Sequence, residues 1–392
     1  MQPTEFYRTL KVDTSPLEAL GFNPYYQPWS GLQHGRPSLR GQLYYDLASN
    51  DYLGLASDAR VDAAAVAALH EYGASQCGTP IATGHAQILA DLEGALARFT
   101  GLEAARVFPS CYQANLALFP AIAKPADLII VDHYAHASLA LGIKSVGCKV
   151  KPFLHNDLAH LEKQLAGSAA YRQTFVVTES VFSTEGTVAP LDGIVGLCRK
   201  FAAVPVVDDS HGIGVLGKTG RGILEEKALD DYDGIYTASL GKALAHMGGV
   251  IAGRRDFIEA LSFSCAGLIY STALTPVCAG GLLCVLQIIE QEFAELQSRL
   301  WHNHRRLVAA LRRGGLEVLA GAAPIAAIPG GSVQDTLALA RRLFEHGLLG
   351  TPFVPPSVPP GQGILRLIVG AKLDEPAMQG LLETLGRVFE VK

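Results

Sequence analysis

Val206-Val207-Asp208-Asp209-Ser210-His211-Gly212, followed later in the chain by Ser239-Leu240-Gly241-Lys242-Ala243-Leu244, is the pair of segments that decides how this chain folds and works. The first is an apolar run that ends in a carboxylate. The second places one lysine in a small, glycine-flanked and otherwise apolar turn. An acid that ends an apolar strand is expected at the carboxyl edge of a parallel sheet, where open α/β folds bind their ligands.

Around these segments, short apolar runs alternate with longer segments of helical periodicity. Apolar spacing predicts alanine-rich or amphipathic helices over residues 61–71 and 88–99. Strands that alternate with helices indicate a mostly parallel sheet covered on both faces, so the predicted fold class is α/β. The predicted strands are residues 105–108, 126–131, 149–153, 174–178, 205–207, 234–238 and 249–253.

The pattern changes after Pro276. Residues 277–311 predict one long helix with a polar face. Clusters of glycine and proline at 321–331 and 352–363 then predict turns in the C-terminal part. A closing strand and helix are predicted at 365–369 and 378–388. We expect an N-terminal segment (1–56), a large cofactor-binding domain (57–276) and a smaller α+β C-terminal domain (277–392).

The composition limits the kinds of partner and the compartment that we expect for this protein. The chain has 392 residues, 49% apolar and 18% charged, with a net charge of -5, which favours a well-buried enzyme or an obligate oligomer and gives no reason to expect nucleic acid. Seven cysteines without a CxxC pair suggest neither a disulfide framework nor a metal site. No signal peptide is recognised, and the longest apolar stretch, 279–289, is shorter than the ~20 residues of a membrane span. We therefore expect a cytoplasmic protein without a transmembrane segment.

The acid and the lysine together suit pyridoxal phosphate (PLP) chemistry. Asp208 would keep the pyridine nitrogen protonated, so that the ring acts as an electron sink, and Lys242 would hold the aldehyde as a Schiff base. Partial burial in a small apolar segment would make this amine a better nucleophile and base. The plainer alternatives are a helix cap, which suits Asp209 better than Asp208, and a surface lysine.

Two segments offer groups for a phosphate. Residues 109–115 are predicted to form a turn between a strand and a helix at 116–123. Ser110 could cap that helix and bind phosphate at its N-terminus. Ser239, three residues before Lys242, could give its hydroxyl to the same phosphate.

Two histidines could contact the ring. His136, in the segment 132–138, could stack on the pyridine. His133 and His136 could instead bind a metal, although no acidic or thiolate partner lies close by. His211 could reach the cofactor's O3′ or a substrate carbonyl.

In their order along the chain, six segments resemble the α-oxoamine synthases, PLP enzymes of fold type I that include 8-amino-7-oxononanoate synthase, 2-amino-3-ketobutyrate CoA ligase, 5-aminolevulinate synthase and serine palmitoyltransferase. The resemblance covers residues 44 to 390. It implies the PLP-dependent transferase fold, with a large domain on a mostly parallel sheet and a smaller α+β domain, and a homodimer with shared active sites. The matching segments are 49–55, 132–138, 178–183, 208–212, 239–242 and 270–272.

The resemblance assigns catalytic roles to four residues. Lys242 would carry the Schiff base and later move the α-proton, Asp208 would hold the pyridinium, His136 would stack on the ring, and His211 would bond to its O3′.

The resemblance also assigns binding roles. Two residues, Glu179 and Ser183, would support the ring and its hydroxyl. Six would hold the phosphate, the last two from the other subunit: Ser110, Cys111, Tyr112, Ser239, Ser271 and Thr272. Arg366 would bind the amino-acid carboxylate, and Asn50 would contact the same carboxylate or the acyl donor.

Four positions depart from the family pattern: Pro80 and Val354 stand where arginine is usual, Leu89 replaces a frequent histidine, and Cys111 replaces a glycine. All four are loop or pocket positions. They leave the PLP chemistry in place and bear on the acyl-donor pocket.

The expected reaction is the condensation of alanine, glycine or serine with an acyl-CoA or acyl-carrier-protein thioester, usually with loss of CO2, to give an α-amino ketone. A pimeloyl-type donor, as in 8-amino-7-oxononanoate synthase, is our first expectation. The alternatives are a fatty-acyl or carrier-protein donor, as in serine palmitoyltransferase or in signalling and natural-product enzymes, and another fold type I aminotransferase or lyase. A non-catalytic partner subunit is disfavoured because Lys242, Asp208 and Arg366 are present.

Overall fold

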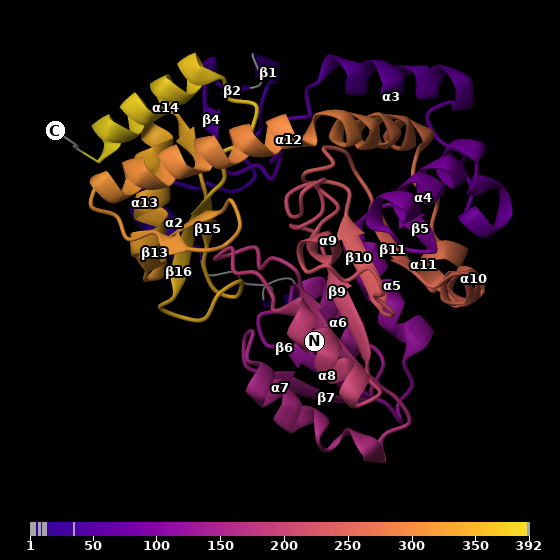
Figure 1. The fold of residues 1–392 in the computed structure, drawn as a ribbon. Helices are drawn as coiled ribbons and strands as arrows, with labels where there is room; N and C mark the ends of the chain where they lie inside the picture. Colours follow the sequence, from indigo (N-terminus) through magenta and orange to yellow (C-terminus); the bar gives the residue numbers. More distant parts are fainter. Residues whose placement is uncertain (1–4, 7–8, 10–13, 34–35, 390–392) are drawn as a thin grey trace.

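A seven-stranded sheet forms the centre of the computed structural model, which describes residues 5–6, 9, 14–33 and 36–389 (Figure 1). Only β11 runs antiparallel to its two neighbours in this sheet; the remaining neighbouring pairs are parallel. The predicted mostly parallel sheet is thereby confirmed. In spatial order the strands are β5 (Ala104–Phe108), β11 (Gly249–Gly253), β10 (Ile235–Ser239), β9 (Val204–Asp208), β8 (Thr174–Glu179), β6 (Leu128–Asp132) and β7 (Lys149–Phe153).

Alternate residues of the central strands point into two separate apolar cores. In β6, Leu128 and Ile130 belong to one core and Ile129 to the other; in β8, Val176 and Val177 divide in the same way. Strand side chains alternate between faces, so a strand buried on both sides must be apolar throughout. The continuous apolar runs of the sequence have this cause.

Helices cover both faces of the sheet. Leu118 and Leu139, from α5 and α6, pack in one core, whereas Leu92 and Ile194, from α4 and α8, pack in the other. The helices and short turns of this part are α3 (Ala59–Tyr72), η1 (Pro80–Gly84), α4 (Gln87–Thr100), α5 (Cys111–Ile122), α6 (Ala137–Lys144), α7 (Leu158–Leu165), η2 (Ser168–Ala170), α8 (Leu191–Lys200), α9 (Ile223–Glu226), α10 (Arg255–Ser264) and α11 (Ala266–Ile269).

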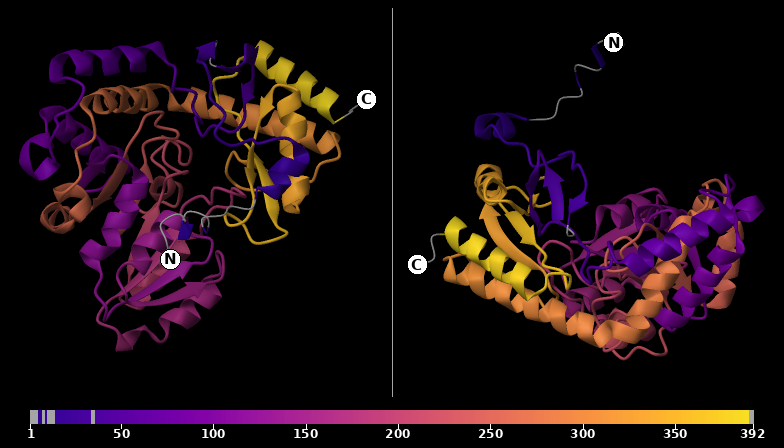
Figure 2. Two further views of the ribbon diagram at one scale, coloured as in Figure 1. Left: turned by 180° about the vertical axis from the view of Figure 1, so that it is seen from behind. Right: turned by 90° about the horizontal axis from the view of Figure 1, so that it is seen from above.

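One long helix, α12 (Pro276–Arg313), connects the two parts of the molecule, as both views of Figure 2 show. Leu282 and Leu300 lie in a core of the central sheet, whereas Leu307 and Leu311 lie in a third core under the smaller sheet. By length and composition alone α12 could cross a membrane, but half of its most apolar window is buried inside the protein. Its apolar residues therefore serve the packing of the two parts.

The smaller part is built from a four-stranded sheet and the helices beside it. Its strand order is β12-β13-β16-β15. β4, from the N-terminal segment, pairs with β14 of this part, and Leu47 lies in its core. The elements are β12 (Leu319–Ala320), β13 (Ala326–Gly331), α13 (Val333–Glu345), β14 (Leu348–Leu349), β15 (Thr351–Phe353), β16 (Gly363–Leu367) and α14 (Glu375–Val388), with α2 (Ser15–Leu20), β1 (Leu32–Gln33), β2 (Arg36–Leu39), β3 (Gln42–Leu43) and β4 (Tyr45–Asp46) before them.

Three details differ from the sequence predictions. β13 occupies about half of the glycine and proline cluster at 321–331, where turns were expected. α13 was not predicted at all. The helix expected at 116–123 begins at Cys111, because Ser110 caps it by accepting a hydrogen bond from the Gln113 N–H. The domain limits at 56 and 276 remain predictions.

Candidate active site

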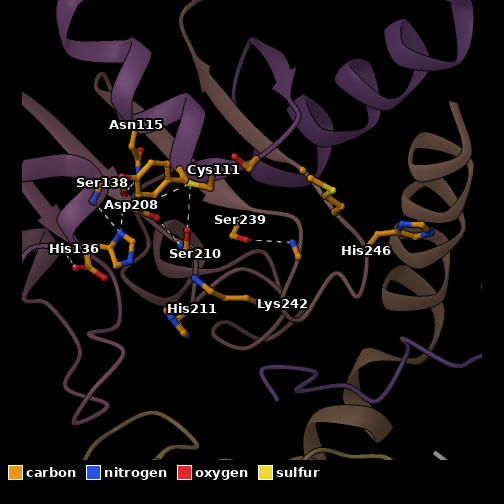
Figure 3. A pocket seen from close by; sticks show the side chains of 16 residues that line it. Cys111, Asn115, His136, Ser138, Asp208, Ser210, His211, Ser239, Lys242 and His246 are labelled. Atoms are coloured by element: carbon orange, nitrogen blue, oxygen red, sulfur yellow. Dashed lines mark hydrogen bonds between the residues drawn. The ribbon is translucent and has the colours of Figure 1, made fainter. Parts of the chain in front are cut away.

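A cavity of about 430 Å³ opens at the carboxyl edge of the central sheet (Figure 3). The ends of β8, β9 and β10 and the starts of α5 and α6 surround it, as expected for an open α/β sheet. Nine residues predicted from the sequence line it: Ser110, Cys111, Tyr112, His136, Glu179, Asp208, His211, Ser239 and Lys242. Five other predicted residues, Asn50, Ser183, Ser271, Thr272 and Arg366, are not among its lining residues.

Lys242 follows β10 in a short turn, and its side chain points toward the group of residues around Asp208 (Figure 3). Burial lowers the pKa of the amine, while the nearby Asp208 charge acts in the opposite direction. A lowered pKa favours the free amine, the form that attacks an aldehyde and accepts a proton.

Asp208 ends β9 and is almost fully buried. Its Oδ2 accepts a hydrogen bond from Asn115 Nδ2 at 2.6 Å, and its Oδ1 accepts one from the backbone N–H of Ser210 at 3.0 Å. The Cys111 thiol lies beside the carboxylate, 4.0 Å from Oδ2, and burial raises its pKa. A buried carboxylate with two donors is suited to face a cation such as a pyridinium.

Asp209 faces a different set of partners. Its Oδ2 accepts hydrogen bonds from Tyr236 Oη at 2.9 Å and from the N–H of Ile223, the first residue of α9, at 3.0 Å. Burial raises its pKa to about 7. Asp209 thus binds a free backbone N–H at the start of α9, the next helix along the chain, in agreement with the capping alternative considered for this acid.

His136 is the N-cap residue of α6 and is exposed at the cavity wall. Its Nδ1 lies 2.7 Å from Ser138 Oγ, and its backbone N–H donates to Glu179 Oε1 at 2.6 Å. Desolvation lowers the pKa of His136; the Asp208 charge opposes this effect and the Lys242 charge adds to it. Burial raises the pKa of Glu179 well above its usual range, and the Asp208 charge adds to the effect.

His211 is buried and pairs with Tyr52, whose hydroxyl lies 2.8 Å from His211 Nδ1. Burial holds the pKa of His211 well below its usual range, with the charges of Lys242 and Arg366 in support. The ring is therefore neutral at pH 7. Tyr52 lies within a motif quoted above, but no role had been predicted for it.

Arg366, on β16, is 5% exposed and lies close enough for its charge to lower the pKa of Lys242. Its Nη1 donates to the Ser183 carbonyl at 3.1 Å, and the guanidinium lies over the Phe353 ring. Its Nε is buried without a partner among the described residues, and so is Oδ1 of Asn50. Such buried polar groups indicate that a polar ligand completes the site.

Ser271 and Thr272 follow α11 and lie away from the cavity of their own chain, so the structure of one chain does not bring them together with Lys242. Asn115 and Ser138, which line the cavity, were not predicted as site residues. The sequence signal for Asn115 is its position four residues after Cys111, which places both on one face of α5 once Ser110 is taken as the cap.

Comparison with known proteins gives a consistent result. The family model for aminotransferase class I and II matches residues 44–385. The chain is 36% identical over 381 residues to a putative 8-amino-7-oxononanoate synthase of Desulforudis audaxviator (strain MP104C), covering 97% of this chain and 98% of that protein. It is 38% identical to the 8-amino-7-oxononanoate synthase of Methylobacterium sp. (strain 4-46), with 94% and 93% covered.

A solved structure supports the same assignment. Serine palmitoyltransferase from S. paucimobilis, with PLP and myriocin bound, superimposes with a TM-score of 0.93 at 25% identity, and the match covers 100% of both chains. Fold, cavity and sequence thus agree, and the chain belongs to the aminotransferase class I and II family, within its α-oxoamine synthase branch of PLP-dependent acyltransferases.

Proposed function

We propose that this protein joins a small α-amino acid to an acyl thioester and releases CO2 and the free thiol, in the manner of an 8-amino-7-oxononanoate synthase. The observation that carries the proposal is the meeting of Lys242 and Asp208 in one cavity at the edge of the sheet. The similarity to named synthases along nearly the whole chain supports it.

The residues of the cavity fit PLP. A partly buried amine faces a buried carboxylate, and the capped N-terminus of α5 supplies backbone N–H groups for a phosphate. In our assignment Lys242 and Asp208 hold the aldehyde and the pyridine nitrogen. The phosphate would be held by Ser110, Cys111, Tyr112 and Ser239, with Ser271 and Thr272 reaching it from the second subunit of a homodimer. When bound, PLP supplies an electron sink for negative charge on the α-carbon of the amino acid.

We assign separate roles to the residues around the cofactor site. Nζ of Lys242 accepts the α-proton, for which its lowered pKa suits it. The guanidinium of Arg366 binds the amino-acid carboxylate as a bidentate donor and uses its unpartnered Nε. The unpartnered Oδ1 of Asn50 would accept a hydrogen bond from a donor on the acyl substrate. His136 lies against the ring. Glu179 and His211 would contact the ring hydroxyl, and Ser183 supports Arg366 through its carbonyl.

The names of the relatives indicate the substrates. 8-Amino-7-oxononanoate carries its amine and its ketone on adjacent carbons. If the bond between these two carbons is disconnected, one fragment has the carbon skeleton of decarboxylated alanine. The other fragment is a seven-carbon dicarboxylic acyl group. We therefore propose alanine as amino substrate and a pimeloyl thioester as donor, carried by CoA or by a carrier protein. We also propose that the protein acts in the cytoplasm.

The visible spectrum of the purified protein with PLP tests the proposal. Alanine, glycine and serine are titrated separately, and the products with pimeloyl-CoA or palmitoyl-CoA are identified by mass spectrometry. A yellow band that alanine perturbs, and a product of the mass of 8-amino-7-oxononanoate, support it. A protein that stays colourless, or one that forms no ketone with any pair, would refute it.

A second candidate is serine and a long fatty-acyl thioester, favoured by the full-length structural match to serine palmitoyltransferase. It predicts that serine, not alanine, perturbs the band and that palmitoyl-CoA is consumed. The same experiment therefore separates the two candidates.

A further inference from the structure

Four side chains on the sheet side of the cavity form one hydrogen-bonded series (Figure 3). Asn115 Nδ2 lies 2.6 Å from Asp208 Oδ2 and 3.1 Å from Ser138 Oγ, and Ser138 Oγ lies 2.7 Å from His136 Nδ1. Asn115 and Ser138 are each 1% exposed, so water does not compete for the contacts of Asn115 with Asp208 and Ser138. Side chains from β9, α5 and the start of α6 are thus connected.

The Asp208 carboxylate determines which groups donate and which accept in the first two of these hydrogen bonds. An ionised carboxylate can only accept, so the Asn115 group at 2.6 Å from Asp208 is the amide nitrogen; the opposite orientation would set Oδ1 against the carboxylate. The second amide hydrogen lies toward Ser138 Oγ, which therefore accepts from Asn115. Ser138 Oγ can then either donate its hydrogen to His136 Nδ1 or accept a hydrogen from it, and a second contact decides between the two.

The second contact involves the same nitrogen. The backbone N–H of Ser138 lies 3.2 Å from His136 Nδ1, in the capping contact at the start of α6. Because a backbone N–H can only donate, Nδ1 accepts this bond and is the unprotonated nitrogen, and the Ser138 hydroxyl then donates to it as well.

We propose that Asn115 and Ser138 are positioning residues that hold His136 as a neutral imidazole with its proton on Nε2. Toward the cavity the ring then presents a hydrogen-bond donor and no basic nitrogen. His136 is thereby prevented from competing with Lys242 for the α-proton, a consequence that rests on the proposed function, whereas the tautomer itself rests on the contacts above.

Long-range ¹H–¹⁵N correlation spectra of the full-length protein, labelled with [¹⁵N]histidine, test the tautomer with and without added PLP. His136→Gln assigns the His136 signals among the 12 histidines. The wild type is expected to show protonated Nε2. Ser138→Ala and Asn115→Ala are expected to shift the ratio of the two tautomers toward protonated Nδ1 by roughly three- to tenfold, the size of one net hydrogen bond.

Ser145→Ala is the matched control, because Ser145 ends the same helix and its hydroxyl donates to the Gly142 carbonyl instead. Its spectrum should equal that of the wild type, and Ser138→Thr, which keeps the hydroxyl, should restore the wild-type tautomer. A wild-type proton on Nδ1, or unchanged His136 signals in both Ala variants, would overturn the proposal. If the Ala variants fail to fold, neutron diffraction of the wild type locates the same proton directly.

The two proposals fail separately. A protein without a PLP band that still shows protonated Nε2 refutes the proposed function and leaves the positioning pair intact. A yellow, active enzyme with a proton on Nδ1 of His136 refutes the positioning role of Asn115 and Ser138 and leaves the proposed function intact.

Discussion

The Asp208 side of the active site and the Arg366 side differ in whether the charged group already has its hydrogen-bond partners. On the Asp208 side, both oxygens of Asp208 and Nδ1 of His136 have donors within 3.2 Å. On the Arg366 side, Nε of the guanidinium is buried without a partner among the described residues. The Asp208 carboxylate is held by protein donors, whereas Arg366 keeps a free donor for which, in our proposal, the substrate carboxylate would be the acceptor.

The largest effect should come from removing the Lys242 amine. We expect Lys242→Ala to abolish the yellow band and to lower turnover by at least roughly 10³-fold, because the base and the covalent attachment are both lost. Absorption and product formation measure this. Lys218→Ala, at an exposed position in a loop, is the control and should leave both unchanged. A variant that keeps a tenth of wild-type turnover would remove Lys242 from the chemistry.

Arg366→Met should separate the two sides most clearly. We expect KM for the amino acid to rise roughly 100-fold, the loss of charge-assisted hydrogen bonds to a carboxylate. Without substrate, the free energy of unfolding should stay constant or increase, because a buried cation that lacks a carboxylate partner has been removed.

Substrate kinetics and chemical denaturation measure these two effects, and Arg387→Met, at an exposed position on α14, is the control. A loss of stability without a change in KM would contradict the assignment of Arg366 to the substrate.

Asp209→Asn should leave turnover largely intact and change the pH dependence of stability. With a folded pKa of about 7 against an ordinary value of 3.8, the folded state holds the proton more tightly. This carboxyl therefore adds stability as the pH falls through 7, and the contribution is absent at pH 8. The wild type should gain about 2–3 kcal/mol from it between pH 8 and pH 5, and the variant should not.

Denaturation at both pH values measures the difference, with the exposed Asp91→Asn as control. The burial of His211 acts in the opposite direction, since its lowered pKa costs stability as the pH falls below its ordinary value near 6.5, but it is common to both proteins. Equal slopes for wild type and variant would show that Asp209 stays ionised.

Local signals explain what could be predicted. Asp208 ends a run that is apolar on both faces, and Lys242 stands alone in a small apolar turn, so position and chemistry could be inferred together. α13 also has such signals, since Ser332 caps it and Leu337, Ala340 and Leu343 repeat at helical spacing, yet the surrounding glycines and prolines obscured them.

Contacts between distant segments could not be predicted. Tyr52 meets His211 across 159 positions of the chain, and Asn115 meets Asp208 across 93. No periodicity encodes such a pair, because it depends on how two strands and their loops are placed in the sheet. The hydrogen bonds that organise the Asp208 side are therefore the part of the site that required a structure.

The continuity of α12 has a mechanical consequence. Its 38 residues make a rod about 57 Å long, whose two halves are embedded in different cores. A bend of about 5° near its middle would swing the far end by roughly 2.5 Å, enough to make or break a hydrogen bond. Small flexing of this helix would therefore move the smaller part, which carries Arg366, relative to the central sheet, which carries Lys242.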